Sequence, residues 1–212
     1  GNGGALCLDN PDAIKKAKLL RSWGRSSSLL DGESENAENR FNIDLDGIDY
    51  DAKFVFELPG YNLEGNEIGA AFGLVQLKHL ENNIKVRDCN MERQMEYFER
   101  HSNFFDNPIQ RLNSKTGFLA FPILIKEKAP FSRKQFQIYL EERDIQTRVC
   151  FTGNVLRQPM ANNISKRVDA AGYPNSDAVM ERGVLLPLHH GMTDDMFERL
   201  HATIDAFISQ YS

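Results

Sequence analysis

Apolar residues recur at helical spacing over residues 66–100, and this pattern predicts one helix of about 35 residues. The first half contains the small-residue run 69–73, so we expect it to be buried against residues outside this chain or against a partner subunit. The second half is charged on most faces, so we expect it to be solvated. A helix with two such halves is typical of a strut that joins two domains.

Shorter helices are predicted from their capping residues. Asn10 opens a helix that ends near Trp23-Gly24, and Ser132 with Gln135 forms a capping box that opens a helix through Glu142. Two further helices are expected, one capped by Ser176 and ending at Gly183, the other opened by Thr193. The inward-facing residues are expected to be Phe136, Tyr139 and Leu140 in the second helix and Met196, Leu200, Ile204 and Phe207 in the last.

Short apolar runs predict strands at residues 53–56, 118–125, 147–151 and 184–188. Pro122 and Pro187 favour an edge, a bulge or a strand end, because proline cannot donate to a ladder. The last three strands alternate with helices. The pattern therefore predicts an α/β unit whose sheet is covered mainly on one face.

Two stretches of the chain, residues 1–4 and 25–51, do not fit the predicted helices and strands. The chain opens with Gly1–Gly4 followed by strand-like residues, which we interpret as a larger domain interrupted within a motif, the alternative being a tag remnant. Residues 25–51 contain few apolar positions, and we interpret them as an excursion that forms a lid or a partner-contacting loop. Within it, residues 42–47 imitate a calcium loop, but Lys53 occupies the place of the bidentate glutamate, so we expect an acidic solvated turn.

Composition excludes several classes of protein. The 212 residues carry 25 Lys and Arg against 30 Asp and Glu, a formal charge of −5, which argues against a general nucleic-acid binder. The sequence contains neither a signal-peptide pattern nor an apolar run long enough to span a bilayer, so no membrane partner is expected. Three widely spaced cysteines are typical of reduced thiols, and we expect a cytoplasmic protein.

Candidate chemistry lies in the last third of the chain. His189-His190 follows a strand, where a histidine contacts substrate or only shapes a loop; metal-ligand spacing is lacking. Arg148 and Arg157 flank a Gly-Asn loop, where they hold phosphate or carboxylate, or else make surface ion pairs. Cys150 is expected to be a small buried residue rather than a nucleophile. These residues alone indicate an α/β fragment with a polar, anion-binding cleft.

Four segments of the chain together resemble the DegT/StrS family of pyridoxal-phosphate (PLP) sugar aminotransferases and dehydratases. The segments are Gly1-Asn2-Gly3-Gly4-Ala5; Leu19, Arg21 and Trp23-Gly24-Arg25; Pro59-Gly60-Tyr61-Asn62 with Glu67, Ile68, Ala70, Ala71, Gly73 and Leu77; and residues 187–193. Thr147-Arg148 and residues 152–159 are similar to the branch that removes the C3 hydroxyl of nucleotide-linked 4-keto-6-deoxyhexoses.

The resemblance implies the aspartate aminotransferase fold, PLP fold type I. Residues 1–85 would be the end of the large PLP-binding domain, and residues 86–212 the small C-terminal α/β domain, joined by the long helix. The residue that faces the cofactor, Lys in aminotransferases and His in dehydratases, would precede Gly1. The resemblance therefore implies no catalytic residue in this chain and no activity for the chain alone.

The resemblance also implies roles for individual residues. Asn62 matches the residue that reaches the PLP phosphate of the other subunit in a homodimer, and Tyr61 would wall the same pocket. His189, Arg148 and Arg157 match positions near the sugar or the nucleotide phosphate, and Arg25 accompanies them as a substrate-binding residue. Leu63-Glu64-Gly65 replaces the Tyr-Arg that often follows Asn62, a departure that argues against a nucleotide contact from this loop.

Three functions follow from these implications. The first is a PLP-dependent nucleotide-sugar 3-dehydratase of lipopolysaccharide or O-antigen sugar biosynthesis. The second is a sugar aminotransferase of the same family. The third belongs to another class, a non-catalytic binding or regulatory module on a remnant of the fold.

Overall fold

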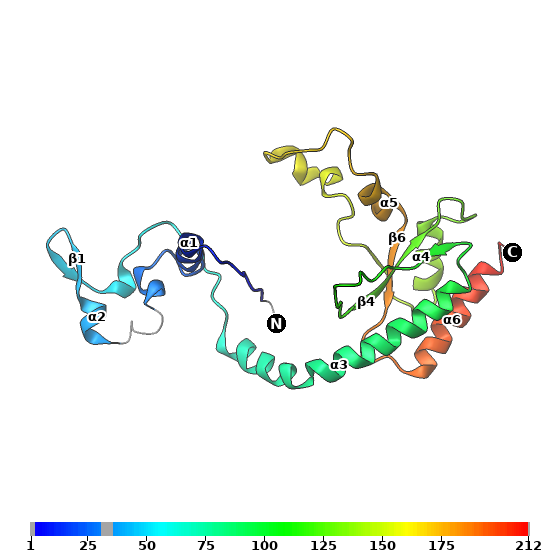
Figure 1. Ribbon diagram of the computed structural model, residues 1–212, viewed down its shortest axis with the longest axis horizontal. Coiled ribbons are helices and arrows are strands. Elements are labelled where there is room, and N and C mark those ends of the chain that lie inside the picture. The colour runs from blue at the N-terminus through cyan, green and yellow to red at the C-terminus, as the bar shows by residue number, and fades with distance from the viewer. Residues whose placement is uncertain (1–2, 31–35, 212) are drawn as a thin grey trace. The chain divides into compact units, whose positions relative to one another are not determined.

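The computed structural model describes residues 3–30 and 36–211, so Gly1, Asn2 and part of the 25–51 excursion lie outside the described residues (Figure 1). The chain divides into two compact units, Gly1–Lys78 and His79–Ser212, and the boundary falls inside the long helix. Residues 3–10 form no strand, so the strand expected after Gly4 is wrong.

The first unit begins with α1, Pro11–Arg21, followed by the short helix η1, Ser26–Leu29. The side chain of Asn10 accepts a hydrogen bond from the amide of Ala13 at 3.0 Å, which confirms the expected cap. Ser22 follows α1 directly, so the helix ends just before Trp23-Gly24, as expected.

The excursion contains secondary structure of its own. Helix α2, Ala37–Phe41, leads into a hairpin of β1, Ile43–Leu45, and β2, Ile48–Tyr50. Asp46 and Gly47 have φ of 54° and 84°, as a two-residue type I′ turn requires. Asp44 accepts a hydrogen bond from the amide of Gly47 at 2.9 Å, so these acidic residues build a turn.

The strand expected at residues 53–56 is wrong. Ala52–Phe54 forms a short helix, η3, because the Asp51 carboxylate caps it by accepting from the amide of Lys53 at 2.9 Å. Phe56 takes part only in an isolated bridge to Arg25. Within the described residues, no helix has the length and apolar character needed to cross a bilayer.

The long helix α3 runs over Glu67–Glu99 and confirms the expected element. The second half is buried, so the expectation that it is solvated is wrong: Gln94 and Tyr97 are 0% and 1% exposed. In the first half, Ile68 and Leu77 are 85% and 62% exposed within this chain, which is compatible with the cover expected from outside it. The second half packs on the second unit, and the described residues leave the apolar first half uncovered. Charges on most faces therefore did not keep the second half in water.

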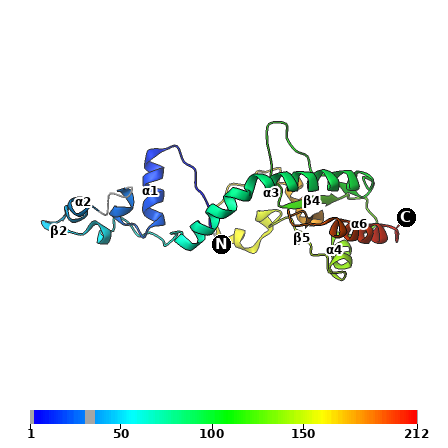
Figure 2. The same ribbon diagram turned by 90° about the horizontal axis from the view of Figure 1, so that it is seen from below.

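The second unit is built on a four-stranded antiparallel sheet in the order β3-β4-β6-β5. Its strands are β3, Phe105–Asp106; β4, Ala120–Ile125; β5, Arg148–Val149; and β6, Gly183–Pro187. Strands β4 and β6 lie side by side at its centre (Figure 1). In the view of Figure 2, α3 runs above α4 and α6 of this unit. Buried Phe121, Ile123 and Ile125 alternate with half-buried residues along β4, as in a sheet covered mainly on one face. Pro122 lies beyond the register with β3, which covers only Leu124 and Ile125.

Three helices belong to this unit: α4, Arg133–Glu141, α5, Pro174–Arg182, and α6, Asp194–Ile208. The short helices η4, Val155–Arg157, and η5, Pro159–Asn163, follow β5. The capping box of Ser132 and the cap at Thr193 are confirmed. Two expectations are wrong: Ser176 lies inside α5, which Pro174 opens, and Met196 is 51% exposed, whereas its neighbour Phe197 is 1% exposed and turns inward.

The core of this unit is rich in aromatic side chains. Phe98 of α3 stacks on Phe121 of β4 with ring centroids 5.3 Å apart, and Phe136 of α4 packs on Phe207 of α6 at 5.3 Å. All four rings are at most 2% exposed. Each buried side chain of this size stabilises the fold by about 1.5–3 kcal/mol, so the core holds α3, α4 and α6 against the sheet.

Candidate functional site

In the first unit, the loop with Tyr61 and Asn62 is bonded to the end of α1 through its backbone. The amide of Tyr61 donates to the carbonyl of Leu20 at 2.7 Å, and the carbonyl of Tyr61 accepts from the amide of Trp23 at 2.8 Å. The amide of Leu63 donates to the carbonyl of Arg21 at 2.9 Å. These three backbone hydrogen bonds therefore fix the position of the loop against the C-terminal end of α1.

Two glycines allow the backbones to approach this closely. Gly24 has φ of 83°, and a Cβ there would lie 1.7 Å from the carbonyl oxygen of Leu58. A Cβ at Gly60 would lie 2.3 Å from the amide nitrogen of Gly24. Any side chain at either position would therefore push the two segments apart.

The side chains of Tyr61 and Asn62 point outward from this anchored loop. Tyr61 is 65% exposed, and Asn62 is exposed with its backbone bridged to Ser22. In the described part of the chain, the Asn62 carboxamide has no hydrogen-bond partner. It can therefore donate to an acceptor supplied from outside the unit.

Glu64 lies in the segment Leu63-Glu64-Gly65, where the family often has Tyr-Arg after the residue matched by Asn62. Its carboxylate accepts a hydrogen bond from the Ser22 hydroxyl and lies 3.4 Å from Nε of Arg21. The Glu64 carboxylate therefore adds side-chain contacts between the loop and the end of α1 to the backbone hydrogen bonds. Residues 63–65 contain no basic side chain that would bind a nucleotide phosphate.

Arg25 is the other predicted residue of this unit. Its guanidinium lies 4.2 Å from the ring centroid of Trp23, and the residue is half-buried. Its Nε is buried and, among the described residues, has no acceptor. An unpaired buried N–H is rare in proteins, and the half-buried guanidinium that carries it is a positive group suited to an anion.

In the second unit, His189 follows the end of β6 and is exposed. Its Nδ1 accepts a hydrogen bond from the amide of Gly191 at 3.2 Å. In the neutral ring the proton therefore resides on Nε2, which becomes a donor available to a ligand.

Arg157 lies on η4 and is paired with Asp177 of α5. Its Nε lies 2.5 Å from Oδ1 of Asp177, which also accepts from Asn154 at 2.8 Å. These hydrogen bonds, that from Arg157 first, lower the pKa of Asp177 to about 2, and the carboxylate in turn raises the pKa of Arg157. The surface ion pair, one of the two alternatives open for Arg157, is therefore present.

Arg148 is exposed on β5, and its Nη1 donates to the carbonyl of Thr147 at 2.7 Å. The adjacent Cys150 is half-buried, and burial raises the pKa of its thiol. A raised pKa disfavours the thiolate, as expected for a packing residue.

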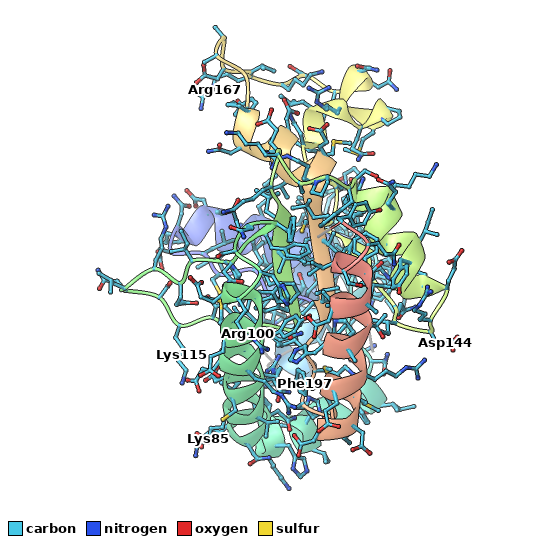
Figure 3. The ribbon with its side chains drawn as sticks, turned by 90° about the vertical axis from the view of Figure 1, so that its right-hand side faces the viewer. Lys85, Arg100, Lys115, Asp144, Arg167 and Phe197 are labelled. Atoms are coloured by element: carbon cyan, nitrogen blue, oxygen red, sulfur yellow. The ribbon has the colours of Figure 1, made fainter. Side chains whose placement is uncertain are left out.

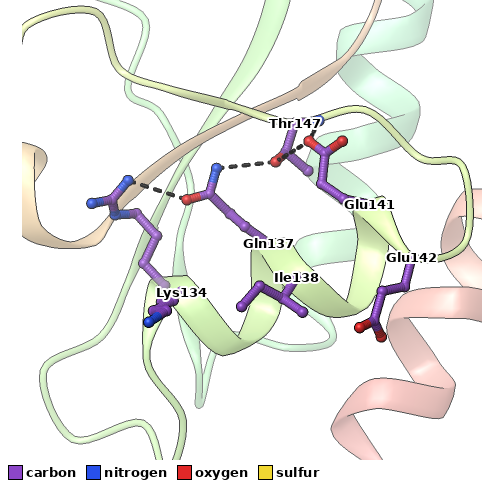
Figure 4. Close-up of a pocket in the computed structure, with 7 residues that line it drawn as sticks. Lys134, Gln137, Ile138, Glu141, Glu142 and Thr147 are labelled. Atoms are coloured by element: carbon purple, nitrogen blue, oxygen red, sulfur yellow. Dashed lines mark hydrogen bonds between the residues drawn. The ribbon is translucent and has the colours of Figure 1, made fainter.

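A surface hollow on α4 borders the start of β5 (Figure 4). Arg133 donates to Gln137 at 3.1 Å, Gln137 donates to the Thr147 hydroxyl at 3.0 Å, and the Thr147 amide donates to Glu141 at 2.6 Å. The two hydrogen bonds from Thr147 hold the pKa of Glu141 below its ordinary value. This network fixes the backbone immediately before Arg148, and sequence patterns gave no sign of it.

The predicted site residues fall into two groups of three. Arg25, Tyr61 and Asn62 belong to the first unit, and Arg148, Arg157 and His189 belong to the second. Inside the first unit, the Trp23–Arg25 turn lies against the Tyr61 loop through the hydrogen bonds described above. Inside the second, Arg148 pairs with Leu185 of β6, the strand that leads to His189.

Comparison with known proteins gives the family. The family model described as the DegT/DnrJ/EryC1/StrS aminotransferase family matches residues 1–205. The chain is 28% identical over 209 residues to the lipopolysaccharide biosynthesis protein RfbH of Salmonella typhimurium, covering 98% of this chain and 48% of the relative. It is 31% identical over 175 residues to a GDP-4-keto-6-deoxy-D-mannose 3-dehydratase of Escherichia coli O55:H7, covering 82% of this chain and 42% of the relative.

A solved structure with the same fold is a GDP-4-keto-6-deoxymannose-3-dehydratase crystallised with a trapped PLP-glutamate geminal diamine. Its TM-score is 0.64 at 27% sequence identity, covering 72% of this chain and 39% of that chain. The expected α/β fold of PLP fold type I is thereby confirmed. The chain spans about half the length of the curated relatives it matches.

Proposed function

Because the chain belongs to the DegT/DnrJ/EryC1/StrS aminotransferase family, we propose that the full-length protein is a PLP-dependent 3-dehydratase of nucleotide-linked 4-keto-6-deoxyhexoses. The likeness to two such dehydratases, at 31% and 27% identity, carries this proposal. The likeness to RfbH supports a role in lipopolysaccharide or O-antigen sugar biosynthesis. The proposed domains are residues 1–85, the end of the large domain, and residues 86–212, the small domain.

The exposed loop of the first unit fits a role in binding PLP. The free carboxamide of Asn62 is a neutral donor suited to the phosphate dianion, and Tyr61 beside it offers an exposed ring as a pocket wall. Both side chains point away from their own unit, so we propose that they serve the site of a second subunit in a homodimer. PLP itself would supply an electron sink for the charge left when a proton is removed from the substrate.

The remaining predicted residues fit a nucleotide-sugar substrate. His189 offers the Nε2–H donor, and the half-buried guanidinium of Arg25 supplies positive charge beside Trp23. Arg148 and Arg157 supply positive charge for phosphate, with Arg157 held in a fixed orientation by Asp177. Free thiols at all three cysteines fit a reducing compartment, so the cytoplasm is the proposed location.

A sugar aminotransferase of the same family is the second candidate, supported by the family description itself. The two differ in product: a dehydratase removes the C3 oxygen, whereas an aminotransferase adds nitrogen to the sugar. Mass spectrometry of a nucleotide-linked 4-keto-6-deoxyhexose incubated with the full-length protein, PLP and an amino-acid donor such as glutamate distinguishes them, because the nitrogen that an aminotransferase adds must come from that donor. A non-catalytic module would leave the sugar unchanged and would show no PLP absorbance.

The role of Asn62 is tested by titrating full-length protein with PLP. Loss of one hydrogen bond to a charged group costs about 1.5–3 kcal/mol, so Asn62→Ala is expected to weaken PLP binding at least about tenfold. Asn82→Ala, at an exposed amide on α3, is the matched control and is expected to leave the affinity unchanged. Equal affinities in the two variants would remove Asn62 from the cofactor site.

A further inference from the structure

A buried amide of α3 holds the backbone at His189. Asn90 is 9% exposed, and its Nδ2 donates to the carbonyls of Leu188 at 3.3 Å and His189 at 3.1 Å. The β6 ladder ends at the Pro187–Ala120 pair, so both carbonyls lie beyond the sheet. The two N–H groups of one carboxamide therefore replace the donors that a neighbouring strand would have supplied.

One turn further along the same face, Gln94 holds α6. Gln94 is 0% exposed; its Nε2 donates to the carbonyl of Pro187 at 3.5 Å, and its Oε1 lies 2.7 Å from Nε2 of His201. Arg93 pairs with Asp194 at the start of α6 at 2.6 Å. The helices α3 and α6 lie side by side, with Arg100 and Phe197 on their facing sides (Figure 3). The turn between β6 and α6 is therefore fastened to α3 at both ends.

The contacts of His189 itself are set by this turn. Its carbonyl accepts from Asn90 and also from the amide of Met192 at 3.1 Å, while its Nδ1 accepts from Gly191. The Gly191 contact directs the Nε2–H outward, and the Asn90 contact fixes the backbone from which the ring projects. A change at Asn90 would move the imidazole without touching it.

We propose that Asn90 is a positioning residue for His189: its buried carboxamide sets the place of the imidazole that contacts the sugar. This inference rests on the proposed function, in which His189 binds substrate. Gln94 supports the same turn by tying Pro187 to His201. A shift of about 1 Å in a substrate contact costs up to about a hundredfold in rate, so a contact loosened at one carboxamide is expected to cost about tenfold.

The test compares Asn90→Leu with Asn82→Leu in the full-length protein. N90L removes the donor at similar volume without placing a charge in the core, and N82L makes the same change at an exposed position of the same helix. Three quantities are measured with the nucleotide-sugar substrate below the unfolding temperature: KM, kcat and the hydrogen exchange of peptides that cover residues 187–193. N90S, which keeps a hydroxyl donor, is made alongside N90L in case N90L fails to fold.

We expect N90L to raise KM about tenfold, with a smaller change in kcat, and to speed exchange of the 187–193 amides. N82L should change neither. In a His189→Ala background, N90L should have no further effect on KM, because Asn90 acts through that side chain. The KM of N90S should lie between those of N82L and N90L.

Three results overturn the inference, and the two that refute only the positioning role are distinguishable from the one that refutes the substrate role of His189. If H189A raises KM but N90L leaves KM unchanged, the positioning role is refuted and the proposed function stands. The positioning role is also refuted, with the proposed function intact, if the N90L effect on KM persists in the H189A background. An unchanged KM in H189A refutes the substrate role of His189, and this inference fails with it.

Discussion

The way the Asn62 loop is attached to α1 can be tested by replacing Gly60 with alanine. A Cβ at this position would lie 2.3 Å from the amide nitrogen of Gly24 and 2.5 Å from the carbonyl carbon of Trp23. Both neighbours are backbone atoms, so neither can rotate out of the way. The loop carrying Asn62 must then move off the end of α1.

The cost follows from the contacts that this movement breaks. Overpacking of a close contact costs about 1–3 kcal/mol. The hydrogen bonds from Tyr61 to Leu20 and from Trp23 to Tyr61, at 2.7 and 2.8 Å, would lengthen or break, each losing about 1 kcal/mol. We therefore expect Gly60→Ala to lower the free energy of unfolding by about 3–5 kcal/mol and to weaken PLP binding, because Asn62 moves with the loop.

The measurement is urea unfolding of the full-length protein followed by circular dichroism, with PLP titration on the same samples. Gly65→Ala is the matched control: it lies three residues beyond Asn62, and a Cβ there would meet no atom within 4 Å. We expect this control to change stability by less than about 0.5 kcal/mol. If the two variants have the same unfolding midpoint and PLP affinity, the proposed close packing of the loop on α1 is refuted.

Two further predictions concern the contacts between α3 and α6. Tyr97→Phe removes the hydroxyl that donates to Asp205 at 2.8 Å but keeps the ring, whose centroid lies 3.7 Å from that of His201. The free energy of unfolding, measured in urea, should therefore fall by about 1 kcal/mol. An unchanged unfolding midpoint would contradict this. Burial, reinforced by Arg93 and Arg100, lowers the pKa of His201 from 6.5 to about 4. Between these values the folded protein binds fewer protons than the unfolded chain, so stability should fall as pH drops from 6.5 to 4. His201→Phe should flatten this dependence, and an equal slope of midpoint against pH would disprove the assignment.

Features set by neighbouring residues were predictable from the sequence. Asn10, Ser132 and Thr193 cap their helices as expected, because each side chain accepts from an amide only three residues away. The inward face of α6 was less predictable. Met196 and Phe197 are adjacent and both fit an apolar stripe, so only packing against the rest of the unit decides that Phe197 is buried.

Errors arose where a local polar contact opposed the hydrophobic pattern. Residues 53–56 are apolar enough for a strand, but the Asp51 carboxylate bonds the amide of Lys53 and turns the backbone into η3. Likewise, Ser176 is a good capping residue, but Pro174 can occupy the first turn of α5 and the helix begins there. In both places the stronger neighbouring signal was present in the sequence.

The contacts that orient the candidate site could not be predicted, because they join distant positions. Asp177 orients Arg157 from 20 residues away, and Asn90 reaches His189 across 99 positions. Single-sequence patterns place each residue on an element but do not say which elements meet. For Arg157 the alternatives therefore stayed open until the structure placed Asp177 beside it.

The second half of α3 nevertheless carried a signal that its charged appearance concealed. Asn90, Gln94, Tyr97 and His101 follow one another at intervals of four, three and four residues, which places them on one face of a helix. Each bears a polar group that can serve a buried partner, and in the structure the first three bond to the carbonyls of residues 187–189 or to groups of α6, while His101 pairs with Asp205. A helix that crosses the end of a strand must satisfy the carbonyls left beyond the ladder, and amides and hydroxyls do so without the cost of burying a charge. A stripe of polar residues at helical spacing is therefore as informative about packing as an apolar stripe.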